Sequence, residues 1–196
     1  MANTAMRLMT REEFLAWDAP GPTAWQLFEG YPVAMAPSGD DHGTVAANLT
    51  RLIGNRLGSR PPCRIRSEAG VIPAHRRRSY YIADLAVSCR PAEPRRPDIP
   101  DPVLIVEVLS PTTEDDDRKV KLPDYRRLPS VQEILYVDPA RVYCELHRRL
   151  DGDRWETVIL TDLAESLSLA VCDAEIPLGD VYANVALTEV SDDTVR

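Results

Sequence analysis

The sequence PVLIVEVLSPTTEDDDRKVK, residues 102–121, combines a short apolar strand with the start of a charged helix. Residues 103–106 form an uninterrupted apolar run, which is typical of a strand buried on both faces. Alternation along that strand places Glu107 on the same face as Val103 and Ile105. An unpaired carboxylate there would cost several kcal/mol in desolvation. The sequence therefore predicts that a cation or a set of hydrogen-bond donors neutralises Glu107.

The segment from Thr113 to Leu128 predicts a helix that follows this strand. Its acidic residues come first and its basic residues come later, which is the order that complements the helix macrodipole. Pro123 predicts a first turn or a kink within the segment. Lys121 is expected to point back toward the sheet.

A second apolar strand with a single carboxylate is predicted at residues 80–87, YYIADLAV. Alternation groups Asp84 with Ile82 and Ala86 on one face of that strand. The two acidic strands are joined by a loop at residues 91–102, which contains five prolines. Proline stiffens such a connection without folding it into a helix or a strand.

These residues suit metal-assisted hydrolysis of phosphodiester bonds. Asp84 and Glu107 offer hard oxygen ligands for Mg²⁺ or Mn²⁺. The ion would polarise the scissile phosphate and lower the pKa of a bound water, while Lys121 would orient that water or stabilise the developing charge. The alternative interpretation is structural, because acids at strand ends also reach solvent or pair with arginines.

Other patterns predict the elements around these strands. The N-terminal part predicts a helix after the capping box of Thr10 and Glu13, and an edge hairpin at 25–35 that turns at Glu29 and Gly30. An amphipathic helix is predicted at 41–57, and strands are predicted near 69–72 and at 134–137. The C-terminal part predicts a hairpin of 142–146 with 155–160 and a short helix at 177–185. We expect an α/β fold with a mixed central sheet flanked by helices and an additional C-terminal hairpin. Residues 1–190 would form one domain and residues 191–196 a polar tail.

Composition limits the class of protein. A chain of 196 residues with 44% apolar and 28% charged residues is ordinary for one globular domain. Neither a membrane span nor a signal peptide is indicated, so we expect a soluble cytoplasmic protein with no membrane partner. The cysteines show no paired spacing and are expected to be reduced, packed thiols. They are Cys63, Cys89, Cys144 and Cys172.

Charge and histidine give weaker signals. The net charge of −8 argues against a broadly basic surface for nucleic acid. Arg76, Arg77 and Arg78 form a local basic cluster, which is either a solvated loop or part of a binding surface. His42 begins the amphipathic helix and is expected to be a capping or surface residue rather than a ligand.

Several stretches together carry a family resemblance. They are MTREEFLAW, WQLFEGYPVAMAPSGDDH, the helix around residues 45–49, YYIADLAVSCR, PVLIVEVLSP, the spacing of Lys121 and Tyr125, and ILYVDP. The chain thereby resembles the Uma-two family of proposed restriction endonucleases, part of the PD-(D/E)XK nuclease superfamily. The resemblance runs from Met9 to about Tyr182, and PVLIVEVLSP is its most specific part.

The resemblance implies a restriction-endonuclease-like core and a Mg²⁺-dependent endonuclease, with Mn²⁺ as a substitute and DNA as the expected nucleic acid. Asp84 is similar to the family's first metal-binding acid and Glu107 to the second, and the carbonyl of Val108 is expected to be a backbone ligand. The superfamily pattern places the catalytic lysine where this chain has Leu109. Lys121, on the following helix, is similar to the displaced lysine of this family.

Three positions depart from the family pattern. Ala83 replaces the motif's proline, and Gln26 and Tyr31 stand where many relatives are expected to have acids, so that an auxiliary carboxylate could be missing. The alternative function is a catalytically silent nuclease-fold module for binding or interaction. Metal binding would count against that alternative, whereas a Lys121 ion pair on the outer surface would favour it. A homodimer is expected for an enzyme that cuts two strands.

Overall fold

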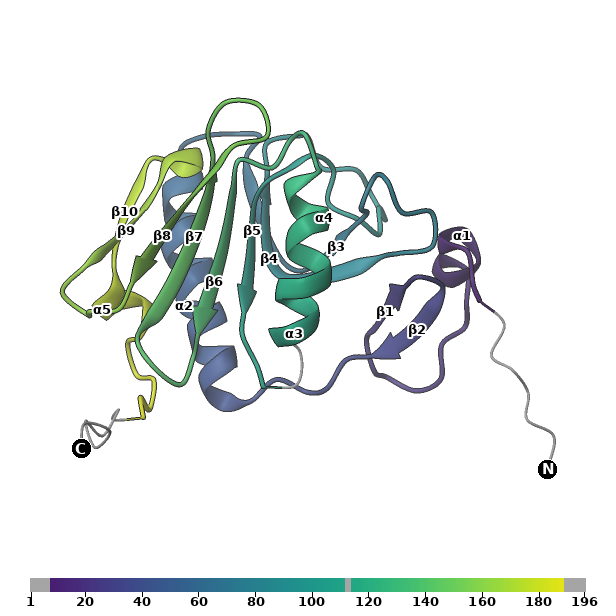
Figure 1. Cartoon of the computed structure of the whole chain (residues 1–196), viewed down its shortest axis with the longest axis horizontal. Coiled ribbons are helices and arrows are strands. Elements are labelled where there is room, and N and C mark those ends of the chain that lie inside the picture. Colours follow the sequence, from purple (N-terminus) through teal and green to yellow (C-terminus); the bar gives the residue numbers. More distant parts are fainter. Residues whose placement is uncertain (1–7, 112–113, 189–196) are drawn as a thin grey trace.

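The fold is built on a mixed sheet of six strands, in the order β3-β4-β5-β6-β7-β8 (Figure 1). The computed structural model describes residues 8–111 and 114–188. The strands are β3 (Arg64–Val71), β4 (Tyr81–Ser88), β5 (Pro102–Val108), β6 (Glu133–Asp138), β7 (Tyr143–Arg149) and β8 (Trp155–Leu160). The β5–β6 pair is parallel and the other four pairs are antiparallel. This confirms the predicted mixed central sheet and the hairpin of β7 and β8.

Helices cover both faces of the sheet (Figure 1). The helix α2 (Asp40–Leu57) packs on one face through Val45, Leu49, Ile53 and Leu57, which are buried with β4 and β5 side chains. The predicted apolar stripe consists of these four residues and Leu52, which is partly buried against the same cluster. The opposite face packs against a second cluster that includes Ile105 and Tyr125. No helix in the described part of the chain has the length and apolar character needed to cross a membrane.

The second covering helix links the parallel strands β5 and β6. It consists of α3 (Glu114–Asp116), a π-helical turn η1 (Asp117–Lys121) and α4 (Leu122–Arg126). The predicted helix is therefore confirmed between residues 114 and 126, while Thr113 lies outside the described residues. Pro123 stands in the first turn of α4. Because proline lacks an N–H and crowds the carbonyl four residues earlier, the helix widens into the π turn just before it.

The N-terminal part forms as the local signals predict. The helix α1 (Arg11–Leu15) starts with the capping box of Thr10 and Glu13. The strands β1 (Trp25–Phe28) and β2 (Tyr31–Ala34) form an antiparallel hairpin. Its turn residues, Glu29 and Gly30, have φ values of 48° and 93°, the left-handed backbone that a tight hairpin requires.

The C-terminal part contains a hairpin that the sequence patterns do not predict. The strands β9 (Ser166–Leu169) and β10 (Ala174–Pro177) form a separate antiparallel sheet, joined by the 3₁₀ turn η2 (Ala170–Cys172). The predicted last helix is present but short, as α5 (Leu178–Val181). The predicted tail at 191–196 lies outside the described residues.

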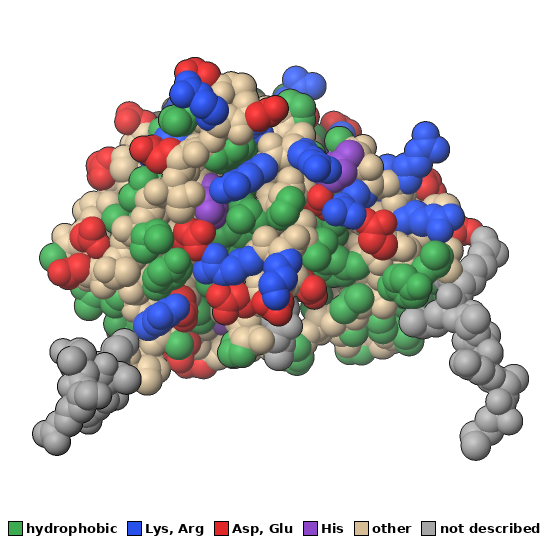
Figure 2. All heavy atoms as spheres, in the orientation of Figure 1, with side chains coloured by type: hydrophobic (Ala, Val, Ile, Leu, Met, Phe, Trp, Pro, Cys, Tyr) green, Lys and Arg blue, Asp and Glu red, His purple; other side chains and the backbone are tan. Residues whose placement is uncertain are grey.

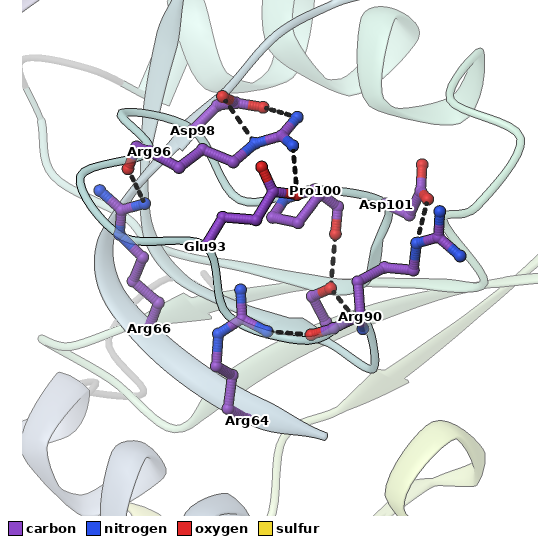
Figure 3. Close-up of polar contacts among 9 residues, drawn as sticks. Arg64, Arg66, Arg90, Glu93, Arg96, Asp98, Pro100 and Asp101 are labelled. Carbon is purple, nitrogen blue, oxygen red and sulfur yellow. Dashed lines mark hydrogen bonds and ion pairs between the residues drawn. The ribbon is translucent and has the colours of Figure 1, made fainter. Parts of the chain in front are cut away.

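The proline-rich loop runs along the outer edge of β3 (Figure 3). The N–H of Ile99 donates to the Gly70 carbonyl at 2.8 Å, and Arg66 donates to the Pro97 carbonyl at 2.9 Å. The Tyr80 hydroxyl donates to the same Pro97 carbonyl at 2.9 Å. A Cβ at Gly70 would overlap that hydroxyl. The loop can lie flat on β3 only because residue 70 is glycine.

The prediction that all four cysteines are reduced is wrong for two of them. Cys63 and Cys89 form a disulfide. Cys63 directly precedes β3 and Cys89 directly follows β4, and Arg64 is paired with Ser88 in the register of these strands. The antiparallel pairing therefore brings the two cysteines together although they are 26 positions apart. Cys144 and Cys172 are free and buried, as predicted.

Candidate active site

Asp84, Glu107 and Lys121 come together around one cavity of about 220 Å³, which Val108 also lines. Asp84 comes from β4, Glu107 from the end of β5, and Lys121 from η1. The Asp84 N–H donates to Glu107 Oε2 at 3.4 Å, and Lys121 Nζ lies 3.2 Å from Glu107 Oε1. The structure thus places the two predicted acids and the predicted lysine at one point of the sheet.

Asp84 occupies a place where the alternation of β4 is interrupted. Tyr81 and Ala83 belong to the cluster under α4, whereas Leu85 belongs to the cluster under α2. Regular alternation would place Tyr81, Ala83 and Leu85 on one face of the sheet. The strand therefore changes face at Asp84, and the prediction of unbroken alternation through this residue is wrong. In the neighbouring strand, Glu68 lies at this level with a φ of 46°. Such irregularities re-aim a side chain, and Asp84 Oδ2 here accepts the Val108 N–H at 2.7 Å.

Glu107 is buried and has the partners that its position demands. Lys121 Nζ is close to Oε1, and the Tyr125 hydroxyl donates to the same oxygen at 2.7 Å. The prediction that a cation and donors neutralise this carboxylate is confirmed. Burial nevertheless raises the pKa of Glu107 to about 8, although Lys121 and Tyr125 act in the opposite direction. A further positive charge in the cavity would favour the ionised form.

Lys121 is held by three contacts inside the protein. Its ammonium lies 2.9 Å from Asp117 Oδ1 and 3.2 Å from Glu107 Oε1, and it donates to the Ile82 carbonyl at 3.2 Å. Burial alone would lower the pKa of Lys121, but Glu107 and Asp117 outweigh it and raise the pKa. The side chain is 4% exposed, so the outer-surface ion pair that would favour a silent module is not found.

Sequence patterns missed His42 as a neighbour of this cavity. Its Nε2 lies 3.4 Å from Asp84 Oδ2, and the hydrogen bond with Asp84 raises the pKa of His42 against the effect of burial. The capping prediction is wrong, because Gly39 is the N-cap of α2. The available signal was periodicity: His42 continues the row of Val45 and Leu49 at helical spacing and so faces inward.

The helix also contributes two residues that were not predicted as site residues. Asp117 and Tyr125 stand four positions before and after Lys121, so all three lie on one side of the helix. Asp117 pairs with Lys121, and its own carbonyl accepts the Tyr136 hydroxyl at 2.9 Å. These contacts fix the helix against β5 and β6.

Two of the three positions that depart from the family pattern, Gln26 and Tyr31, differ in their surroundings. Gln26 is buried and lines the cavity, and its Oε1 accepts the Ile82 N–H at 2.9 Å. Tyr31 is 50% exposed. A neutral side chain therefore occupies position 26 in the cavity wall, where an acid was expected in relatives.

The donor set fits a hard divalent cation that keeps part of its water shell. Within residues 8–111 and 114–188, no three His, Cys, Asp or Glu side chains form a ready-made metal cage. Mg²⁺ commonly needs only one or two carboxylates, with waters or carbonyls in the other positions. Asp84, Glu107 and Val108 line one cavity, where the two carboxylates and the Val108 carbonyl would be oxygen donors of that kind.

A larger cavity of about 850 Å³ adjoins the same residues. Asp84 and His42 line both cavities. The remaining walls of the larger one come from α2, from β3 near Glu68, and from the segments at 22–24 and 35–38. Asp84 is thus accessible from a space large enough for a substrate segment.

Comparisons with known proteins identify the family and the fold of this chain. The Uma2 family, described as "Putative restriction endonuclease", matches residues 11–178. The uncharacterized protein slr1290 of Synechocystis is 30% identical over 179 residues, which is 91% of this chain and 93% of that protein. The uncharacterized protein sll1609 of the same organism is 26% identical over 168 residues, covering 83% and 92% of the two chains.

The fold is similar to a crystal structure described as a "putative nuclease belonging to DUF820" from Anabaena variabilis. The TM-score is 0.73 at 16% sequence identity, and the match covers 89% of this chain and 97% of the other. The predicted fold class, a restriction-endonuclease-like core, is confirmed. With a family match that spans residues 11–178, this chain belongs to the Uma2 family, described as "Putative restriction endonuclease", and has a restriction-endonuclease-like fold.

Proposed function

We propose that this protein is a metal-dependent endonuclease that hydrolyses phosphodiester bonds of nucleic acid, with DNA as its substrate. The observation that supports this best is the convergence of Asp84, Glu107 and Lys121 at one cavity. These three come from separate elements, and they include the two acids and the displaced lysine that the family pattern requires.

The proposed roles follow from the contacts. Asp84, Glu107 and the Val108 carbonyl hold Mg²⁺, or Mn²⁺ in its place. When bound, such an ion supplies Lewis-acid polarisation of the phosphate and a more acidic water. Tyr125 holds Glu107 in its orientation by the hydrogen bond at 2.7 Å.

Lys121 is proposed to position the attacking water or to stabilise the charge that develops on the phosphate. Its contacts with Glu107 and Asp117 keep the ammonium at the cavity wall, and its raised pKa keeps it protonated. It would therefore act as a cation and a donor, not as a base. We also propose a homodimer as the form that cuts both strands of a duplex.

The test is cleavage of plasmid and single-stranded DNA with Mg²⁺ or Mn²⁺. The variants are Asp84→Asn, Glu107→Gln and Lys121→Met, each checked for folding by circular dichroism. Asp115→Asn and Lys119→Met are matched controls, because these two exposed residues pair with each other on the same helix. We expect metal-dependent cutting that the site variants lose and the controls keep. A protein that binds DNA without cutting it would instead support the silent binding module. Cutting that persists unchanged in the site variants would show that the assigned site is wrong.

A further inference from the structure

The triple-arginine segment forms one side of a second cavity, which we call the basic recess. It has a volume of about 390 Å³ and lies between the hairpin turn of β1 and β2, the segment before β4, and the end of α4. Its lining residues are Glu29, His75, Arg76, Arg77, Arg78 and Arg127. Figure 2 shows Lys and Arg side chains, with a histidine among them, gathered on the face that carries α3 and α4.

Arg76 and His75 are used to hold the recess together. Arg76 forms ion pairs with Glu29 and with Asp124. Asp124 is 1% exposed, lies 2.8 Å from His75 Nε2 and accepts the Tyr81 hydroxyl at 2.6 Å. The buried carboxylate of Asp124 therefore ties this segment to α4 and to β4.

The remaining arginines of the recess are not neutralised. Arg77, Arg78 and Arg127 are exposed, and within the described ranges none of them forms an ion pair or a side-chain hydrogen bond. The backbone beneath them is fixed, since the Gly30 N–H donates to the Arg78 carbonyl at 2.7 Å. Three uncompensated cations converge here in a protein whose net charge is −8. A solvated loop accounts for their exposure but not for their convergence on one anchored concavity.

The recess adjoins the candidate active site through two shared walls. Along the helix, Lys121 lines the site and Arg127 lines the recess, six residues apart, which is about 9 Å at 1.5 Å per residue. In the hairpin, Phe28 lines the site and Glu29 lines the recess. In duplex DNA, successive phosphates of one strand are about 3.4 Å apart along the helix axis. A phosphate in the recess would therefore lie two or three nucleotides from a phosphate in the site.

We propose that the basic recess binds backbone phosphates of the nucleic-acid substrate beside the bond that is cut. Arginine suits this role because its planar fork donates to two phosphate oxygens. The arginines of the recess would provide the affinity for nucleic-acid phosphates that the acidic cavity around Asp84 and Glu107 cannot supply. This inference rests on the proposed function and specifies where its substrate binds.

The experiment measures binding without cleavage, by fluorescence anisotropy of labelled duplex and single-stranded DNA in EDTA over a series of salt concentrations. The recess variants are the double variant Arg77→Ser, Arg78→Ser and the single variant Arg127→Ser. The control is the double variant Arg56→Ser, Arg95→Ser, which removes the same charge at exposed positions outside the recess. Thermal melting checks that all variants fold.

We expect the double recess variant to bind on the order of tenfold more weakly, with a salt slope shallower by about 0.9 for each phosphate that the recess no longer neutralises. Lysine at both positions should restore most of the affinity, and the control should change it less than about twofold. Equal affinity and slope in recess variant and wild type would overturn the proposal. The proposal would also be overturned if the recess bound inorganic phosphate but the recess substitutions left DNA binding unchanged.

The outcome separates this inference from the proposed function. Asp84→Asn should still bind DNA, because the recess lies outside the metal site. DNA binding that depends on the recess in a protein that never cuts DNA would support the recess and reject the nuclease. Cleavage that is unaffected by the recess variants would reject the recess and leave the nuclease standing. A protein that binds no nucleic acid would reject both.

Discussion

The buried ammonium of Lys121 lies 3.2 Å from Oε1 of Glu107. This contact joins the helix between β5 and β6 to the end of β5. Among the described residues, Lys121 is the only cation in contact with Glu107. Asp117 contacts the same ammonium, so one cation is shared by two buried carboxylates. The stability of the fold and the charge of the candidate site thus depend on one side chain.

Replacing Lys121 with Met should destabilise the protein by about 3 to 5 kcal/mol, because it leaves two carboxylates buried without their cation. The free energy of unfolding from urea titration at pH 9, where Glu107 is ionised, measures this. Lys119→Met, which removes an exposed ammonium, should cost less than about 0.5 kcal/mol. Adding Glu107→Gln to Lys121→Met should recover part of the loss. A cost for Lys121→Met no larger than that of Lys119→Met would show that the ion pair contributes little.

Metal binding should raise the melting temperature. At a concentration 100 times the dissociation constant, Mg²⁺ or Mn²⁺ should add about 2.7 kcal/mol, or roughly 5 to 11 °C for a chain of this size. EDTA should reverse the shift, and Asp84→Asn should abolish it while Asp115→Asn keeps it. Differential scanning calorimetry with and without the ion measures the effect. A shift that persists in Asp84→Asn would place the ion elsewhere.

Reduction of the Cys63–Cys89 disulfide should lower stability by about 3.5 kcal/mol, from the loop entropy of a 26-residue separation. Urea unfolding with and without dithiothreitol measures this loss. The double variant Cys63→Ser, Cys89→Ser should show the same loss and no further response to reductant. A further response would mean that the buried thiols of Cys144 and Cys172 also exchange.

Stability should fall between pH 6.5 and pH 4 because of His147. Burial lowers its pKa to about 4, in spite of the opposing effect of Glu145, whereas the unfolded chain takes up this proton near pH 6.5. Within that window the unfolded state binds more protons, so stability is complete above it and declines as the pH falls. His147→Gln should remove roughly 1 to 3 kcal/mol of this decline.

The measurement for His147 is urea unfolding at several pH values, with the difference at pH 8 as the baseline because the histidine is neutral there. His147 Nδ1 lies 2.9 Å from both Arg126 and Thr157, so the substitution also changes stability at every pH. Only the slope of the unfolding free energy against pH tests the prediction. Parallel curves for variant and wild type would show that other groups cause the acid response.

Local patterns predicted the helices and most strands, because each depends on spacing within one segment. The row of Val45, Leu49 and Ile53 identified α2, and the apolar run before Glu107 identified β5. The unusual cost of burying Glu107 also predicted that a cation or donors would meet it. Lys121 was expected to point toward the sheet, and the family resemblance linked the two residues.

Features that depend on pairing between segments could not be predicted in this way. The disulfide follows from the register of β3 and β4, which no spacing of the cysteines reveals. The interruption at Asp84 involves the left-handed backbone of Glu68 in the neighbouring strand. His42 reaches Asp84 because the start of α2 packs against the end of the acidic strands. The short strands β9 and β10 lack a periodic signal of useful length.

Gly70 has a consequence beyond the packing of the proline-rich loop. By letting the loop lie on β3, it keeps the outer N–H and C=O groups of this strand from meeting a strand of another molecule. A larger residue at position 70 would push the loop away and expose that row. The first effect of such a change would be aggregation of folded molecules, strand against strand, while the residues around Asp84 stayed in place.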